Sequence, residues 1–184
     1  DKNSDGIGEV WVKGPTVMKG YLDEPELTAE AIVDGWLRTG DLGRFDASGH
    51  LKLVGRTRNM IVTSGGKNIY PEDIEVHFDE LNDEFEEFCV SAVNFIWPND
   101  AGTDAMTNET LALVLRLGEG EEFDDSQLKL IRRLNYRLAD FKRISHLVIV
   151  EEEFPRTASM KVKRAALAAA IRAKFSRGAA LKDL

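Results

Sequence analysis

The chain has 184 residues, of which 43% are hydrophobic and 30% charged, and its formal net charge is −8. This composition is ordinary for a globular protein, and the negative charge argues against general nucleic-acid binding. No apolar run approaches the roughly 18 residues that span a bilayer, and no signal-peptide pattern opens the chain. The single cysteine, Cys89, excludes a disulfide scaffold and favours a cytoplasmic location. Peripheral membrane association of a longer protein is left open.

The first third of the chain has the alternating pattern and the turn residues of a small sheet. A short strand is predicted at 8–13, a short helix within 23–35, and a hairpin over 36–56 that turns at Ala-Ser-Gly 47–49. The chain opens on Asp1, in mid-pattern, and we therefore expect it to be a piece of a longer protein. Residues 1–55 are interpreted as the end of a large, β-rich N-terminal domain.

Residues 56–184 have the periodicity of a compact domain of strands and helices. A helix is predicted from Pro71, with Ile74, Phe78 and Leu81 on its buried side, where Glu72 and Glu75 are interpreted as helix-start and surface charges. Further strands are predicted at 89–95, 110–116 and 146–151, and further helices at 126–140 and after residue 164. The fold class is therefore α+β, with a small, mostly antiparallel sheet flanked by helices.

Two charged residues flank the predicted hairpin. Asp41 follows Thr39 and Gly40, and Arg56 ends the second strand. A carboxylate can accept both hydrogen bonds of a vicinal diol, and an arginine adds donors without losing its charge, so the pair suits a ribose. Taken singly, Asp41 could cap a turn and Arg56 could belong to a surface ion pair.

Four segments in this order resemble the C-terminal part of the adenylate-forming enzymes: GEVWVKGPTVMKGY, GWLRTGDLG, GRTRNMIVTSGGKNIYPEDIE and FPRTASMKVKR. That superfamily comprises acyl-CoA synthetases, adenylation domains of nonribosomal peptide synthetases, and luciferases. The wording GGKNIYP is most similar to the fatty acyl-CoA synthetases. The joint order of the segments, rather than any single residue, favours a functional interpretation.

The resemblance implies a role for individual residues. Asp41 and Arg56 match the residues that bind the ribose of ATP or AMP, and Lys161 matches the catalytic lysine near the α-phosphate during adenylation. Gly65 and Gly66 match a loop that faces the pantetheine of CoA, although alone they would indicate a hairpin turn. Arg58 falls on the hinge about which the mobile C-terminal lid domain, 56–184, rotates.

At two of these positions the chain departs from the pattern. Met160 stands before the lysine, where the family usually has glycine, and this would restrict the close approach of the loop. At the hinge the family more often has Asp or Lys than the bulkier arginine of this chain. No spacing typical of a metal site joins His50, His77, His146 and Cys89.

The resemblance implies an enzyme, an AMP-forming acid–thiol ligase that activates a carboxylic acid, most simply a fatty acid, as acyl-AMP and transfers it to CoA. ATP and Mg²⁺ would be bound mainly by the N-terminal domain, the partner expected outside this chain, and the chain would be inactive alone. Two alternatives stay open. The acyl group could pass to a carrier protein or stop at the adenylate, or the chain could be a degenerate, non-catalytic interaction domain.

Overall fold

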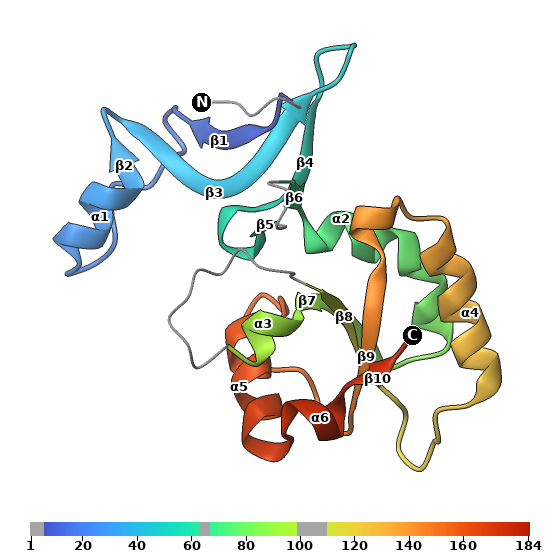
Figure 1. Cartoon of the computed structure of the whole chain (residues 1–184). Helices are drawn as coiled ribbons and strands as arrows, with labels where there is room; N and C mark the ends of the chain where they lie inside the picture. The colour runs from blue at the N-terminus through green and yellow to red at the C-terminus, as the bar shows by residue number, and fades with distance from the viewer. Residues whose placement is uncertain (1–5, 63–66, 99–109) are drawn as a thin grey trace. The chain divides into compact units, whose positions relative to one another are not determined.

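The computed structural model describes residues 6–62, 67–98 and 110–184 (Figure 1). The chain divides into two compact units, Asp1–Met60 and Ile61–Leu184. Helices accompany three small sheets in which most strand pairs are antiparallel. The predicted α+β class is confirmed. None of the helices in the described ranges is long and apolar enough to cross a membrane.

The first unit is a four-stranded sheet built around one long strand. Its elements are β1 (Gly8–Val12), α1 (Pro25–Ala31), β2 (Ile32–Val33), β3 (Trp36–Phe45) and β4 (Leu51–Arg56), followed by the 3-10 turn η1 (Thr57–Asn59). β3 pairs with β1 along one edge and with β2 and β4 along the other, always antiparallel. The predicted hairpin is thus β3 and β4.

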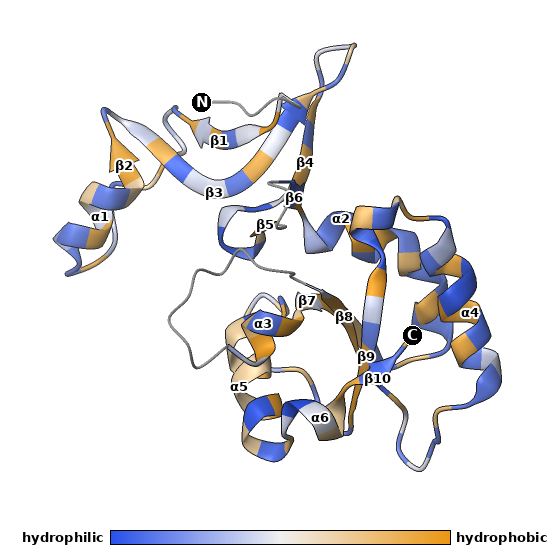
Figure 2. Cartoon of the chain, in the orientation of Figure 1, coloured by the Kyte–Doolittle hydropathy of each residue, from blue (hydrophilic) through white to orange (hydrophobic). Residues whose placement is uncertain are grey.

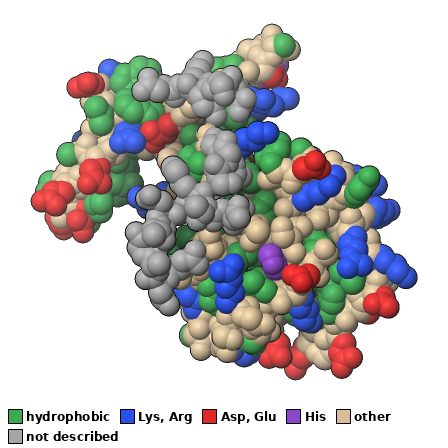
Figure 3. Space-filling model, in the orientation of Figure 1, with side chains coloured by type: hydrophobic (Ala, Val, Ile, Leu, Met, Phe, Trp, Pro, Cys, Tyr) green, Lys and Arg blue, Asp and Glu red, His purple; other side chains and the backbone are tan. Residues whose placement is uncertain are grey.

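This sheet has almost no core of its own. Among residues 6–60, Leu42 is the single hydrophobic residue that is buried. Large side chains such as Phe45 and Leu53, each 63% exposed, and Trp36, 43% exposed, remain at the surface. Figure 3 shows such hydrophobic side chains, in green, gathered over this unit. Large contiguous apolar surfaces often mark interaction sites in proteins.

The second unit contains a four-stranded sheet of order β10-β9-β8-β7 and a two-stranded ribbon of β5 and β6. β8 and β9 are parallel and are joined through α4, whereas β7 and β10 pair antiparallel with their neighbours. The elements are β5 (Ile61–Val62), β6 (Asn68–Ile69), α2 (Pro71–Glu75), η2 (Val76–Asp83), β7 (Glu87–Ala92), α3 (Val93–Ile96), β8 (Leu111–Arg116), α4 (Asp125–Tyr136), η3 (Asp140–Lys142), β9 (Ile144–Val150), α5 (Arg164–Lys174), α6 (Arg177–Ala180) and β10 (Lys182–Asp183).

Strand β8 lies at the centre of this unit, because both of its faces are buried. Leu113 and Leu115 pack in a cluster with Ile131 of α4, and Val114 packs on the opposite side with Ile171 of α5. Figure 2 shows the corresponding apolar strands between amphipathic helices. Alternate side chains of a strand point to opposite faces, so one strand holds together two helical layers.

Two predicted elements end earlier than their periodicity indicates. The helix from Pro71 is α-helical only to Glu75 and continues as the 3-10 segment η2, in which Phe78 has non-helical dihedral angles. The strand predicted at 89–95 ends at Ala92, the last residue paired with β8, and turns into α3. In both cases tertiary packing buries the apolar side chains while the backbone changes type.

Candidate functional site

Asp41 and Arg56 are direct partners in the β3–β4 ladder. Arg56 Nε lies 2.9 Å from Asp41 Oδ1, and the two side chains are 49% and 30% exposed. Cross-strand neighbours of opposite charge meet in this way because antiparallel pairing sets their Cβ atoms close together. In the described part of the chain, Asp41 Oδ2 has no hydrogen-bond donor. A partly exposed carboxylate with an arginine beside it can accept from the hydroxyls of a ligand.

The backbone that carries Asp41 is held by hydrogen bonds from β1. The Thr39 hydroxyl donates to the carbonyl of Val10 at 2.7 Å and accepts from the Asp41 N–H at 3.0 Å. The Gly40 N–H donates to Glu9 Oε1 at 3.2 Å, and Gly40 adopts a φ of 71°, which glycine tolerates without strain. The backbone bend that precedes Asp41 is therefore held by hydrogen bonds at both Thr39 and Gly40.

Glu9, which the sequence patterns did not indicate as a functional residue, accepts the hydrogen bond from this bend. Its Oε2 accepts from the Trp11 indole N–H at 2.9 Å and from Arg38 Nε at 3.2 Å. Burial raises the pKa of the Glu9 carboxyl, but these donors and the Gly40 N–H together lower it below its ordinary value. The available signal was the alternation of GEVWVK, which places Glu9 and Trp11 on one face of β1.

Arg58 and the glycine pair relate differently to the structure. Arg58 is exposed in η1, two residues before the division between the units at Met60 and Ile61. Gly65 and Gly66 lie outside the described residues. The hinge and the pantetheine loop therefore stay predictions.

Lys161 lies on a short hairpin of the second unit. An isolated antiparallel bridge joins Arg156 and Val162. The Thr157 N–H donates to the Lys161 carbonyl at 2.9 Å, and the Lys161 N–H donates to Thr157 Oγ1 at 3.1 Å. The Lys161 side chain is exposed and has no ion-pair partner within the three described ranges. Its ammonium group is thus presented to solvent from a backbone that is held in place.

Met160 has the backbone conformation that the family's glycine would favour. Its φ is 63°, in the left-handed region, and its side chain lies at the surface. A residue with a Cβ atom is strained in this region, typically by about 1–2 kcal/mol. The hairpin therefore accepts Met160, but at a cost in stability.

A second carboxylate that the sequence analysis missed lies beneath this hairpin. Glu87, at the start of β7, has a side chain only 7% exposed, and its Oε2 accepts from Arg116 Nε at 2.8 Å and from the Phe154 N–H at 2.8 Å. Its Oε1 accepts from Arg156 Nε at 3.0 Å and also from Arg156 Nη2. Burial raises the pKa of Glu87, but the Phe154 N–H and the two guanidinium groups together lower it.

Glu75 does not behave as the surface charge that the sequence suggested. Its two carboxylate oxygens lie 2.8 and 3.0 Å from Arg164 Nη2, and Oε1 also accepts from the Val90 N–H at 2.7 Å. Arg164 in turn donates to the carbonyl of Val90 at 2.6 Å. These contacts join α2, β7 and the start of α5. The interpretation of Glu75 is therefore wrong, and its role is structural.

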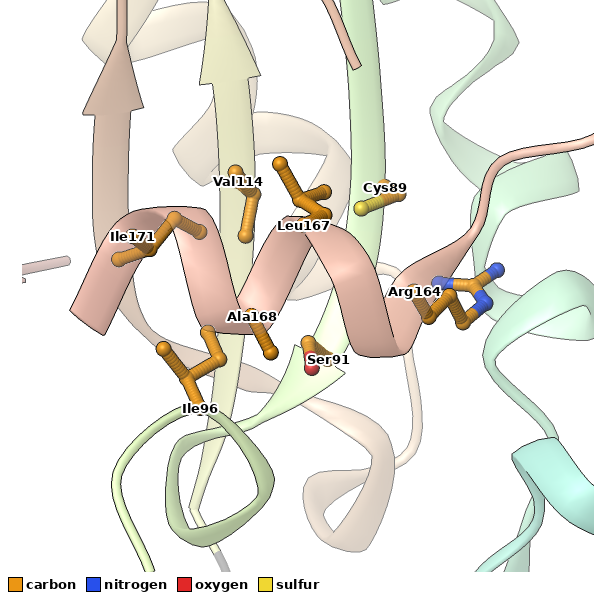
Figure 4. Close-up of a pocket in the computed structure, with 8 residues that line it drawn as sticks. All are labelled: Cys89, Ser91, Ile96, Val114, Arg164, Leu167, Ala168 and Ile171. Carbon is orange, nitrogen blue, oxygen red and sulfur yellow. The ribbon is translucent and has the colours of Figure 1, made fainter. Parts of the chain in front are cut away.

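The cavity beneath α5 is too small for a substrate. Figure 4 shows its lining, which is formed by Cys89, Ser91, Ile96, Val114, Arg164, Leu167, Ala168 and Ile171. Its volume is about 10 Å³, the space of a single water. Burial raises the pKa of the Cys89 thiol to about 12, so this sulfur is protonated at neutral pH and is a poor nucleophile.

Residues 6–62, 67–98 and 110–184 offer no cluster of metal ligands. They contain no group of three His, Cys, Asp or Glu side chains that could hold a metal ion.

The chain is similar in sequence to one part of several longer known proteins. No family model matches the chain. It is 38% identical over 157 residues to a 2-succinylbenzoate–CoA ligase of Listeria innocua, covering 85% of this chain and 30% of that protein. It is 36% identical over 157 residues to a long-chain-fatty-acid–CoA ligase of Bacillus subtilis, covering 85% and 26%. The structure of O-succinylbenzoate coenzyme A synthetase from Bacillus subtilis, in complex with ATP and magnesium ion, superposes with a TM-score of 0.65 at 30% identity, covering 88% and 30%. The chain thus spans about 30% of the length of such proteins.

Replacing Met160 by glycine should stabilise the protein. Glycine removes the strain at φ 63°, and the greater entropy of the unfolded chain offsets part of the gain, so we expect an increase of up to about 1 kcal/mol in the free energy of unfolding. Urea denaturation measures it. Ser159→Gly is the matched control, because Ser159 has no positive φ, and it should be neutral or destabilising. Equal effects of the two substitutions would contradict the strain at Met160.

Glu87 should contribute stability that depends on pH. Its folded pKa lies below the ordinary 4.5, so its contribution is present above about pH 4.5 and is lost as the pH falls through the folded pKa. At about pH 7, Glu87→Gln should lower the free energy of unfolding by about 3 kcal/mol, because two arginines lose a buried partner. Urea titrations from about pH 7 to pH 3 should show this difference shrinking below about pH 4.5. A difference that stays constant with pH would refute the lowered pKa.

Proposed function

Because this chain is a relative of part of the AMP-forming acyl-CoA ligases, in the adenylate-forming superfamily, we propose that it supplies ribose-binding and catalytic residues to an ATP-dependent acid–thiol ligase. The observation that carries this proposal is the Asp41–Arg56 pair, set by strand register and open to solvent on both side chains. In the proposal Asp41 accepts hydrogen bonds from the ribose hydroxyls of ATP and of the adenylate. Arg56 orients the Asp41 carboxylate and adds donors to the same nucleotide.

Lys161 is proposed to act in the first half-reaction. There the carboxylate oxygen of the acid forms a bond to the α-phosphorus of ATP, and pyrophosphate leaves. The reaction brings two anions together, so a cation between them stabilises the transition state more than the separate reactants. Lys161 suits this role because its ammonium group is exposed and without an ion-pair partner in the described chain. In the second half-reaction a thiolate attacks the acyl carbonyl carbon rather than the α-phosphorus, the bond from that carbon to the phosphate oxygen breaks, and AMP leaves.

We further propose that residues 1–55 end a large N-terminal domain and that residues 56–184 form a mobile lid with its hinge at Arg58. The apolar surface of the first unit supports the first part, because a sheet whose single buried hydrophobic residue among 6–60 is Leu42 requires a neighbour for its exposed aromatic side chains. Gly65 and Gly66 are proposed to form the loop against the pantetheine arm of CoA. Most ATP contacts and any Mg²⁺ would then belong to the N-terminal domain, and the 184-residue chain alone would be inactive.

Lys161→Ala in the whole ligase should separate the two half-reactions. We expect pyrophosphate exchange to fall by about 100-fold or more, because the cation at the α-phosphate is lost, and thioester formation from supplied acyl-adenylate to change by less than about threefold. Lys163→Ala is the control, since Lys163 is an exposed lysine two residues further on. Equal losses in both half-reactions would show that Lys161 is structural. An unaffected enzyme would favour a non-catalytic domain.

The thiol acceptor is testable by product analysis. Proteins similar to this chain include ligases named for succinylbenzoate and for long-chain fatty acids, and both of these are CoA ligases. We therefore propose CoA as acceptor and a fatty acid as the acid. Incubating the ligase with ATP and a panel of fatty acids should yield acyl-CoA detectable by mass spectrometry. Acyl transfer only to a phosphopantetheinyl carrier protein, or accumulation of free acyl-AMP with CoA present, would refute the CoA assignment.

A further inference from the structure

We propose that Glu87 and Arg156 are positioning residues for Lys161: together they tie the hairpin that carries this lysine to the central sheet of the second unit. The inference rests on the proposed function of Lys161 and adds two residues to it. Neither side chain is proposed to touch substrate.

The first step is the anchoring of Glu87 in the sheet. Glu87 and Arg116 are directly opposite each other in the antiparallel pairing of β7 and β8, and Arg116 Nε donates to Glu87 Oε2 at 2.8 Å. Both side chains are largely buried, being 7% and 17% exposed. A buried carboxylate held by a buried arginine has few alternative positions, since any movement would leave a charge without its partner. The sheet therefore presents a fixed acceptor.

The second step is the link from this acceptor to the hairpin. The Phe154 N–H donates to Glu87 Oε2 at 2.8 Å, which fixes the backbone two residues before Arg156. Arg156 then donates to Glu87 Oε1 through Nε at 3.0 Å and also through Nη2. Its remaining nitrogen, Nη1, donates to the carbonyl of Met160 at 2.7 Å. One planar guanidinium thus spans the distance from the sheet to the residue before Lys161.

The third step concerns how Lys161 would be held if the link through Arg156 were removed. The hairpin's other hydrogen bonds are local, among them the Arg156–Val162 bridge, the contacts of Thr157 with the Lys161 backbone and the Lys163 N–H bond to the Pro155 carbonyl. They preserve the shape of the turn. Besides the Arg156 link, the packing of Val162 on the apolar cluster beneath α5 also orients the hairpin against the sheet, but it fixes no polar group next to Lys161. Misplacing a catalytic group by about 1 Å can cost about 100-fold in rate. The rigid fork of Arg156 is suited to hold that orientation, and lysine could not replace it, because one ammonium group cannot reproduce the planar fork.

The chain offers a control in Glu80, a more exposed carboxylate of the same unit. Its carboxylate also receives two arginines, Arg133 at 2.6 Å and Arg137 at 3.4 Å, and it joins η2 to α4 in the same unit. Within the described residues, Glu80 makes no hydrogen bond or ion pair with the hairpin. Glu80→Gln therefore removes a double ion pair at the surface, 49% exposed at Glu80, that plays no part in holding Lys161.

The experiment compares Arg156→Lys, Glu87→Gln and Glu80→Gln in the whole ligase, with Lys161→Ala as reference. We expect Arg156→Lys and Glu87→Gln to slow pyrophosphate exchange by about 10- to 100-fold, with the KM for ATP and thioester formation from supplied acyl-adenylate changed by less than about threefold. Glu80→Gln should leave both half-reactions near the parent rate. In Arg156→Ala, millimolar guanidinium ion should restore part of the exchange rate, and it should not do so in Lys161→Ala.

The outcomes separate the two proposals. If Lys161→Ala leaves pyrophosphate exchange intact, the proposed function of Lys161 fails, and the positioning inference fails with it. If Lys161→Ala is slow in exchange but Arg156→Lys is not, only the positioning inference is overturned. It is also overturned if Arg156→Lys loses both half-reactions equally, since that would mean a general structural role. Should Glu87→Gln not fold, the comparison of Arg156→Lys with Lys161→Ala and the guanidinium rescue still decide.

Discussion

A charge taken out of water has to be paired, and this constraint organises the candidate residues of both units. In the second unit Glu87 is the buried charge, and its partners come from a neighbouring strand and from the segment that leads to Lys161. In the first unit the corresponding carboxylate is that of Glu9, which accepts hydrogen bonds from Arg38, Trp11 and the Gly40 N–H. Each carboxylate is bound by an arginine and a backbone N–H together. Each therefore holds a bend of the chain as well as a side chain, and each bend carries a candidate functional residue.

The two units are stabilised in different ways. The second unit buries both faces of β8 against helices, so its stability comes from its own core. The first unit is held by strand pairing and by contacts at its edges, and its large apolar side chains stay at the surface. Strand pairing without a buried face gives little independent stability. This difference supports the proposal that the first unit ends a larger domain, whereas the second unit has its own core.

The sequence predicted best what depends on nearby residues. The β3–β4 hairpin followed from alternation and a turn at 47–49, and it set Asp41 opposite Arg56. Helix α4 followed from its apolar period and gained a capping box from Asp124 and Gln127. Glu87 could not be found in this way, because Arg116 lies 29 residues away in the chain and Arg156 lies 69. The misinterpretation of Glu75 has the same cause, since Arg164 is 89 residues distant. Residues whose partners are that remote look like surface charges in a single sequence.

The exposed position of Lys161 complements the buried position of Glu87. Two other lysines of the second unit are paired, Lys142 with Asp73 and Lys174 with two glutamates. A paired lysine would have to exchange its carboxylate for the ligand's anion, which reduces the net gain from the new contact. Lys161 has no such pair in the described chain, so its charge is available to an anion. Its backbone, by contrast, is tied through Arg156 and Met160 to a carboxylate in the sheet. The backbone of Lys161 is thus fixed through one ion pair, while its ammonium group stays unpaired. A cation that stabilises a transient negative charge needs both a fixed position and a charge that no other group neutralises.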